Sequence, residues 1–322
     1  MSYVTKPAVI FGADIAKDEV LVQRHGESAQ QRLPNTPEPL AAWLAQLPPG
    51  ALLVMEATNT YHELLATLAH AAGVQVVVLN ARCSWHYARS LGVRGKTDRV
   101  DTETLTDFGA TQWQRLHRWE PPTAGNARVA KLLRRRGKLV HAKVALGQSL
   151  STVKELNTLR RQTEQALARM VDRVDLLIIK ALNQDEQLAS LHRLLQTIVG
   201  VGPILAAQLA QALTRMHWSN QDAFVAYTGL DPRPKDSGGR RGRRHLTKHG
   251  PPMLRHLLFM GAMSAVKTPL YKPLYRALRD RGLHTTQALV VVARRIARIA
   301  FAMFRTGELF DPQRLLPAPI HA

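Results

Sequence analysis

The chain has 322 residues, 45% of them hydrophobic, which is enough to bury the core of one large domain or two smaller ones. No apolar run approaches the 18 or so residues of a membrane span, and no N-terminal signal is expected because Met1–Lys6 leads straight into a strand-like run. The single cysteine, Cys83, excludes an intrachain disulfide and fits a reducing cytoplasm; we expect it to be buried.

The positive charge is placed unevenly along the chain. Residues 1–120 contain 11 basic and 12 acidic side chains, whereas residues 121–322 contain 33 and 12. Such asymmetry indicates a polyanionic partner for the later part, and a nucleic-acid backbone is the commonest one. An anionic membrane surface would be the competing partner, but the most apolar late segment, Gln287–Phe304, is interrupted by arginines.

The first 120 residues alternate between strand-like and helix-like patterns. Continuous apolar runs predict strands that are buried on both faces of a sheet, and the first two runs predict a hairpin. The expected strands are Ala8–Asp14, Glu19–Arg24, Ala51–Glu56 and Val74–Leu79, and the expected helices are Pro37–Leu47, Tyr61–Ala72 and Arg82–Leu91. This order predicts an α/β domain whose sheet is partly parallel.

Four acids fall where such a domain can bring them together. Asp14 and Glu56 end two strands, and sites in open α/β sheets form outside the carboxyl ends of strands. Asp98 and Asp101 are three residues apart at the start of an expected helix, so they share one face. Each acid alone fits a turn or a helix cap. Together they predict an oxygen-rich site suited to Mg²⁺ or Mn²⁺.

The composition changes after Pro121-Pro122, which ends the first domain. No proline occurs in residues 124–182, and Leu132, Leu139, Leu146 and Val153 recur at a heptad step, which predicts one or two long helices with a coiled-coil or hairpin seam. A basic cluster lies on this segment. We expect a backbone-binding role for it, although a charge run is more often a solvated face. Its members are Arg134, Arg135, Arg136 and Lys138.

The last part begins with a glycine turn and contains a cationic loop. Gly200-Val-Gly202-Pro203 is typical of a helix-hairpin-helix turn, though a simple turn between two helices would fit as well. Glycines and prolines in residues 229–242 exclude a regular helix. Ser237 lies in this loop; by composition alone it is an ordinary turn residue. The expected nucleic-acid contacts here are Arg240, Arg241, Arg243, Arg244, Lys248 and Arg255, with Lys96 in the first domain.

Four motifs carry a resemblance that spans nearly the whole chain. The acidic blocks containing Asp14, Glu56 and the pair Asp98 and Asp101 resemble those of the DEDD transposases of insertion-sequence family one-ten, which includes the Piv invertase. The stretch around Ser237 is similar to the serine block of the same family. Neighbours such as Ala13, Asn59 and Thr247 depart from the usual pattern, but no carboxylate does.

The resemblance implies a RuvC-like, ribonuclease H-like domain over residues 1–120, a basic helical segment over 121–185 and a helical transposase domain over 186–322. It implies that Asp14, Glu56, Asp98 and Asp101 bind the metal and that Ser237 is the nucleophile. It further implies a bacterial, nucleoid-associated recombinase that acts on DNA as a dimer or tetramer with a structured bridge RNA. The alternatives are a metal-dependent junction nuclease that uses water, and a non-catalytic nucleic-acid-binding protein.

Overall fold

A computed structural model describes residues 6–92, 98–233 and 245–315, with the side chains of residues 98, 99, 314 and 315 left out. The chain divides into two compact units, residues 1–121 and residues 122–322, which are taken separately below. The helices of the expected middle segment fall in the second unit. No helix of the described residues is long and apolar enough to cross a membrane.

The first unit is built on a five-stranded sheet in the order β3-β2-β1-β4-β5. Its strands are β1 (Ile10–Ile15), β2 (Glu19–Arg24), β3 (Gln30–Pro34), β4 (Leu52–Glu56) and β5 (Gln75–Leu79). β1 and β2 form the predicted antiparallel hairpin, and β1, β4 and β5 are parallel. The sequence did not predict β3, since this edge strand buries only Leu33 and therefore lacks an apolar run.

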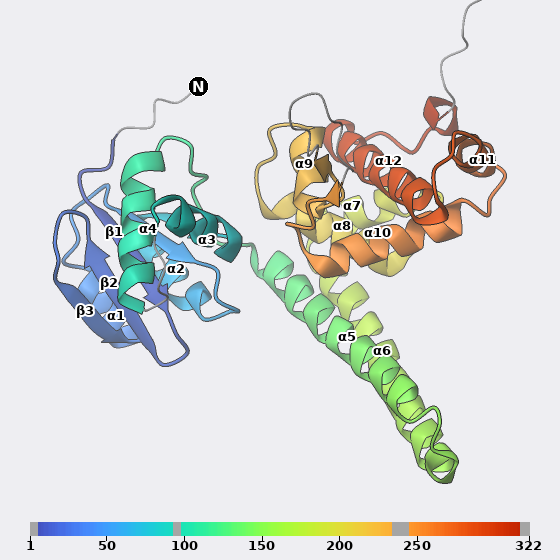
Figure 1. Ribbon diagram of the computed structural model, residues 1–322, viewed down its shortest axis with the longest axis horizontal. Coiled ribbons are helices and arrows are strands. Elements are labelled where there is room, and N and C mark those ends of the chain that lie inside the picture. The colour runs from blue at the N-terminus through green and yellow to red at the C-terminus, as the bar shows by residue number, and fades with distance from the viewer. Residues whose placement is uncertain (1–5, 93–97, 234–244, 316–322) are drawn as a thin grey trace, which may run out of the picture. The chain divides into compact units, whose positions relative to one another are not determined.

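Helices cover both faces of this sheet (Figure 1). They are α1 (Pro37–Leu44), α2 (His62–Ala71), α3 (Ala81–Ser90) and α4 (Asp98–Gln112). One core joins α1 and α2 to Phe11, Ala13 and Leu53. A second core joins Leu105 of α4 to Ile10 and to alternate residues of β4 and β5. The alternation along each strand thus assigns even-numbered residues of β1 and β4 to the α4 face.

Two long helices open the second unit, α5 (Ala124–Ser149) and α6 (Asn157–Asn183), with a short turn of 3-10 helix, η1 (Lys154–Leu156), between them. They lie side by side along their length (Figure 1). The predicted heptad holds only in part, since Leu132 is buried, Leu139 and Leu146 are half-buried, and Val153 lies beyond the end of α5. Coiled-coil packing therefore stays a prediction.

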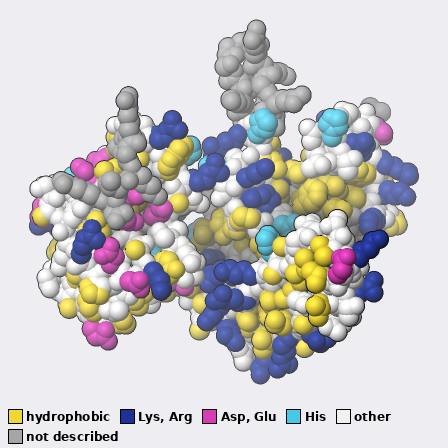
Figure 2. Space-filling view, turned by 60° about the horizontal axis from the view of Figure 1, so that its bottom comes forward, with side chains coloured by type: hydrophobic (Ala, Val, Ile, Leu, Met, Phe, Trp, Pro, Cys, Tyr) yellow, Lys and Arg dark blue, Asp and Glu magenta, His cyan; other side chains and the backbone are white. Residues whose placement is uncertain are grey.

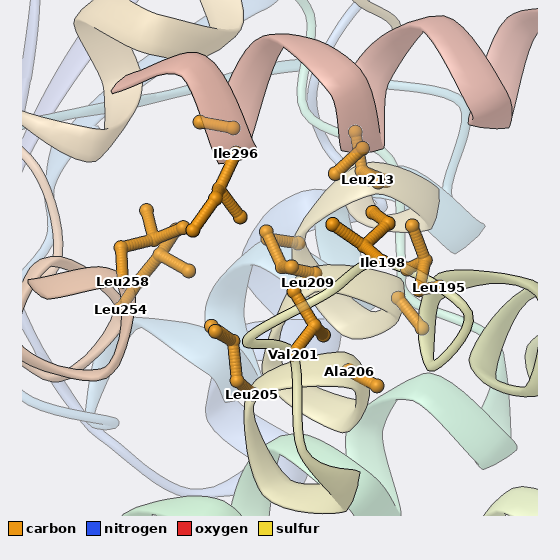
Figure 3. Packing of buried hydrophobic residues seen from close by; sticks show 14 of the residues in the cluster. Leu195, Ile198, Val201, Leu205, Ala206, Leu209, Leu213, Leu254, Leu258 and Ile296 are labelled. Carbon is orange, nitrogen blue, oxygen red and sulfur yellow. The ribbon is translucent and has the colours of Figure 1, made fainter. Parts of the chain in front are cut away.

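In the described part of the second unit, six further helices pack around one apolar core, part of which is drawn in Figure 3. They are α7 (Glu186–Leu195), α8 (Pro203–Arg215), α9 (Gln221–Thr228), α10 (Pro252–Ala265), α11 (Lys272–Asp280) and α12 (Thr285–Thr306), followed by the 3-10 turn η2 (Pro312–Leu315). In Figure 3, Leu205 and Leu209 of α8 lie near Leu254 and Leu258 of α10 and Ile296 of α12. Asn220 caps α9, because its Oδ1 accepts a hydrogen bond of 2.9 Å from the amide of Ala223.

The glycine turn between α7 and α8 has a packing role. Gly200 has φ +90°, and a Cβ there would lie 2.6 Å from the carbonyl oxygen of Gly261 on α10. Only glycine allows both this backbone conformation and this close approach. Gly202 caps α8 and borders open space. The turn thus serves the contact between two helices, and its expected approach to phosphate stays a prediction.

The uneven charge of the sequence is visible on the surface. On the face drawn in Figure 2, Asp and Glu side chains gather on the first unit and Lys and Arg side chains on the second. A cationic surface of this extent is what a protein that neutralises many phosphates requires.

Candidate active site and its family

Asp14 and Glu56 lie at the ends of two adjacent parallel strands. The register pairs Ile10 with Leu52 and continues residue by residue to Ala13 with Met55, so the next position places Asp14 beside Glu56. Both belong to the even-numbered set that faces α4. Because neighbouring strands lie about 4.8 Å apart, the two carboxylates leave the same face side by side.

The first turn of α4 is directed to the same place. A Cβ on Gly109 of α4 would lie 3.0 Å from the Cγ2 of Ile10, and one on Gly12 would lie 2.6 Å from the carbonyl oxygen of Thr102. From Ile10 to Gly12, β1 advances by two residues, and the contact on α4 moves back by about one helical turn. The strand and the helix therefore run antiparallel. Extending this antiparallel course brings Asp14 to the start of α4, where the helix begins at Asp98.

The four expected acids therefore come from elements that meet at one edge. Asp101 is half-buried on the first turn of α4, and the backbone of Asp98 begins this helix, although its side chain lies outside the described residues. Among the side chains that the structure describes, no three His, Cys, Asp or Glu form a group that could hold a metal. The donor set of carboxylate oxygens fits a hard divalent cation, and the role of each acid stays a proposal.

Helix α3 supports this edge from the side of β5. Ser84 is buried, and its hydroxyl donates a hydrogen bond of 2.5 Å to Oε2 of Glu56. One turn on, the Tyr87 hydroxyl donates to Oδ2 of Asp107 at 2.6 Å, and burial together with this acceptor raises the pKa of Tyr87. These contacts fix α3 to both Glu56 and α4. Sequence patterns gave no signal for Ser84, because a serine in a short polar helix is commonplace.

Cys83 corrects one expectation, since it is exposed and not buried. The reason is the orientation of α3, whose inward side is occupied by its neighbour Ser84 and by Tyr87. A cysteine adjacent to Ser84 therefore falls on the solvent side of the helix.

Ser237 and the arginines at positions 240, 241, 243 and 244 lie outside the described residues, as does Lys96. The structure describes the base of the serine loop, where β6 (Pro232–Arg233) pairs antiparallel with β7 (His245–Leu246). The Thr247 hydroxyl bonds the carboxylate of Asp231, and its amide donates to the Asp231 carbonyl at 3.0 Å. The two ends of the serine loop are therefore joined to each other by backbone and side-chain hydrogen bonds.

Arg255 joins the two ends of this base. Its Nη1 donates to the carbonyl oxygens of Thr228 at 3.4 Å and Gly250 at 3.2 Å, and burial lowers the pKa of its guanidinium. In the structure the guanidinium of Arg255 thus binds the protein backbone, and its expected contact with nucleic acid stays a prediction. Lys248 is exposed and has a positive φ of +52°.

The members of the basic cluster on α5 also differ in their contacts with the protein. Arg136 forms a partly buried ion pair with Asp175 of α6, with 2.6 Å between Nε and Oδ1 and a second hydrogen bond from Nη2. Arg134, Arg135 and Lys138 are exposed. The pair holds α5 to α6, and a phosphate-binding role for the basic cluster stays a prediction.

Arg255→Met is expected to weaken the loop base while leaving the helical core intact. Removing both hydrogen bonds leaves two carbonyl groups without this donor. The cost in folding free energy is about 1–3 kcal/mol for a buried group left unsatisfied. Limited proteolysis should then cut near residues 228–250 sooner than in the wild type, with the far-ultraviolet spectrum unchanged. Arg135→Met is the matched control because Arg135 is exposed, and equal cleavage rates in the two variants would contradict the bracing role.

The strand order and the paired carboxylates are consistent with a ribonuclease H-like first domain within a mixed α/β and helical chain. Two family models match the sequence and together cover well over half of it. Residues 11–153 match the DEDD model of IS110 type, described as a transposase, and residues 192–276 match the model described as "Transposase IS116/IS110/IS902 family". The chain belongs to this family of transposases, enzymes that cut and rejoin DNA, as the sequence motifs predicted.

The relatives agree with this assignment. The chain is 27% identical over 267 residues to the pilin gene-inverting protein of Moraxella bovis, covering 80% of this chain and 81% of that protein. It is 24% identical over 342 residues to the transposase for insertion sequence element IS1328 of Yersinia enterocolitica, covering 94% and 98%. A probable family 20 transposase of Pseudomonas aeruginosa is 30% identical over 129 residues, which is 38% of each chain.

Proposed function

We propose that the protein is an insertion-sequence transposase or site-specific recombinase that cuts and rejoins DNA through a phosphoserine intermediate. The observation that carries this proposal is the placement of Asp14 and Glu56 side by side on the sheet face covered by α4. A protein that only bound nucleic acid would have no need of two carboxylates at an edge that DNA phosphates must approach, because they would repel the backbone.

The carboxylates of Asp14, Glu56, Asp98 and Asp101 would hold Mg²⁺, or Mn²⁺ in its place. A divalent ion at such a site supplies charge stabilisation to a phosphoryl oxygen and to the departing oxygen. Ser84 then has a positioning role, because its hydrogen bond sets the direction of the Glu56 carboxylate.

Ser237 is proposed to supply the nucleophile. Its Oγ forms a bond to a backbone phosphorus, and the bond from that phosphorus to one sugar oxygen breaks. The serine hydroxyl loses one proton in this step, and the released sugar oxygen gains one. In the second half, a sugar hydroxyl of another strand attacks the phosphoserine and releases the serine. The number of phosphodiester bonds is conserved, so rejoining needs no further energy source.

Trapping the intermediate tests this mechanism. Wild-type protein, incubated with labelled element-end DNA, its RNA and Mg²⁺ and then denatured, should retain the label as a protein–DNA adduct. Ser237→Ala should give no adduct, while Ser219→Ala, at an exposed serine before α9, should behave as the wild type. If the DNA strand were cut without forming an adduct, and Ser237→Ala still cut it, the result would instead support a nuclease that uses water. A protein that only binds nucleic acid would give neither cleavage nor an adduct, and Asp101→Asn would leave its binding activity unchanged.

We further propose that a structured bridge RNA guides the protein and that it acts as a dimer or tetramer. The support is the family membership and the cationic second unit, which serves RNA as well as DNA. Sequencing of the RNA that co-purifies with the protein should return a transcript from beside the coding frame. Light scattering of the purified complex measures its subunit number.

A further inference from the structure

One face of α3 stays exposed beside the candidate active site. Arg82, Trp85 and Arg89 follow one another at helical spacing, and His86 borders them; these four residues are termed the α3 outer face. All four side chains are exposed. The proposed function assigns no role to this face, which lies opposite the inward side that contains Ser84.

Trp85 is the central side chain of this face. It is 51% exposed, whereas the other four tryptophans of the chain are buried or half-buried. The guanidinium carbon of Arg89 lies 4.9 Å from the Trp85 ring centroid, and the His86 ring packs edge-on against it with centroids 4.8 Å apart. These contacts hold the indole ring in place on the surface. A large exposed ring held in this way is a ready stacking platform.

The charge around Trp85 favours a polyanionic occupant over an apolar one. The first 120 residues carry slightly more acids than bases, yet residues 81–91 contain two arginines, one histidine and no acid. Arg82 and Arg89 are separated by about 10 Å along α3, which is comparable with the screening length of about 8 Å at physiological salt. The outer face is therefore a local positive patch on a unit that is otherwise close to neutral.

The position of the patch points to the DNA strand at the active site. On the inward side of the same helix, Ser84 donates its hydrogen bond to Glu56. Trp85 directly follows Ser84 in the chain, so its Cα lies within about 10 Å of the Glu56 carboxylate. A strand that places a phosphate at the paired carboxylates would have its neighbouring nucleotides beside α3.

We propose that the α3 outer face binds the DNA strand beside the phosphate to be cut, with an unpaired base stacked on Trp85 and backbone phosphates bound by Arg82 and Arg89. The inference rests on the proposed function. It adds a direct contact between the DNA strand and the first unit, which contains the four acids. Unpaired bases are required because the bases of an intact duplex stack on one another and expose only their edges.

The test measures equilibrium binding of fluorescein-labelled DNA in EDTA, so that no strand is cut. Two probes of one sequence are compared, a single strand and the matching duplex. Trp85→Leu should weaken single-strand binding about tenfold to a hundredfold, as expected for loss of one base–aromatic stack, and change duplex binding far less. Trp85→Tyr should restore most of the affinity. Leu91→Ala is the matched control, since Leu91 is 52% exposed and lies just beyond the end of α3.

Two further measurements complete the test. Arg89→Gln should weaken both probes and lower the slope of log affinity against log salt by about 0.7–0.9, the value for one lost phosphate contact. Intrinsic tryptophan fluorescence should be quenched by the single strand in the wild type and much less in Trp85→Leu.

Each result separates this inference from the function on which it rests. Single-strand affinity unchanged in Trp85→Leu, with Mg²⁺-dependent cleavage intact in the wild type, would overturn the α3 contact and leave the proposed function standing. A changed subunit number in Trp85→Leu with unchanged DNA affinity would show instead that this face joins two copies of the chain. A wild type that neither binds nor cuts DNA would overturn both.

Discussion

Asp14→Asn is expected to lower Mg²⁺-dependent DNA cleavage about a thousandfold while the first unit stays folded. The substitution keeps the size of the side chain but removes one of the two charges that lie side by side at the ends of β1 and β4. A bound divalent ion contributes several kcal/mol to the transition state, and each 1.36 kcal/mol is tenfold in rate.

Asp18→Asn is the matched control for this prediction. Asp18 lies in the exposed turn between β1 and β2, so the two variants change the net charge of the same unit equally. Thermal unfolding supplies a readout independent of cleavage, because an ion that binds only the folded protein raises its Tm. Saturating Mg²⁺ should raise the Tm of the wild type and of Asp18→Asn, and not that of Asp14→Asn. A normal Mg²⁺ response in Asp14→Asn would exclude this carboxylate as a ligand.

The positions of Asp14 and Glu56 at one edge of the sheet could be predicted from the sequence because each lies at the end of a recognisable strand. Asp14 and Glu56 follow apolar runs, and the carboxyl ends of parallel strands lie at one edge of a sheet. Their alignment as neighbours could not be predicted, because it depends on the register between β1 and β4. A slip of one residue would move Glu56 to the other face. Only the packing of the two cores fixes that register.

The second unit shows the same limit at single residues. The run of arginines in α5 indicated a surface for phosphates, but no local pattern could show that Arg136 would bind Asp175, which is 39 residues further along the chain. Arg255 likewise reads as a cationic contact in sequence and acts as a brace in the structure. Partners of this kind are set by tertiary packing, which places carbonyl groups and carboxylates from distant segments within reach.

Gly12 is the position where the fold and the candidate site depend most directly on each other. β1 and α4 approach so closely there that a Cβ on Gly12 would lie 2.3 Å from Thr106 Oγ1, 2.6 Å from the Thr102 carbonyl oxygen and 2.7 Å from the Thr106 amide nitrogen. Two of these three atoms belong to the backbone, so a change of rotamer does not relieve the overlap. Any larger residue must push α4 away from the sheet.

Gly12→Ala is therefore expected to destabilise the protein and to impair cleavage together. Overpacking of this kind costs about 1–3 kcal/mol, which corresponds to a fall in Tm of several degrees. Moving α4 outward also moves Asp101 away from Asp14 and Glu56, so Mg²⁺-dependent cleavage should fall even at temperatures where the variant is fully folded. Thermal unfolding and cleavage assays on the full chain measure the two effects.

A second substitution identifies the cause. Thr106→Ala removes the hydroxyl that lies nearest to the new Cβ but leaves both backbone contacts, so the double variant Gly12→Ala/Thr106→Ala should recover only part of the lost stability. Gly147→Ala in α5 is the control, because the nearest heavy atom to its Cβ position is the end of the flexible Glu164 side chain, at 3.0 Å. Full recovery in the double variant would show that the hydroxyl alone is the obstacle. Partial recovery of stability with cleavage still impaired would show that the distance between β1 and the start of α4 sets the geometry of the carboxylates.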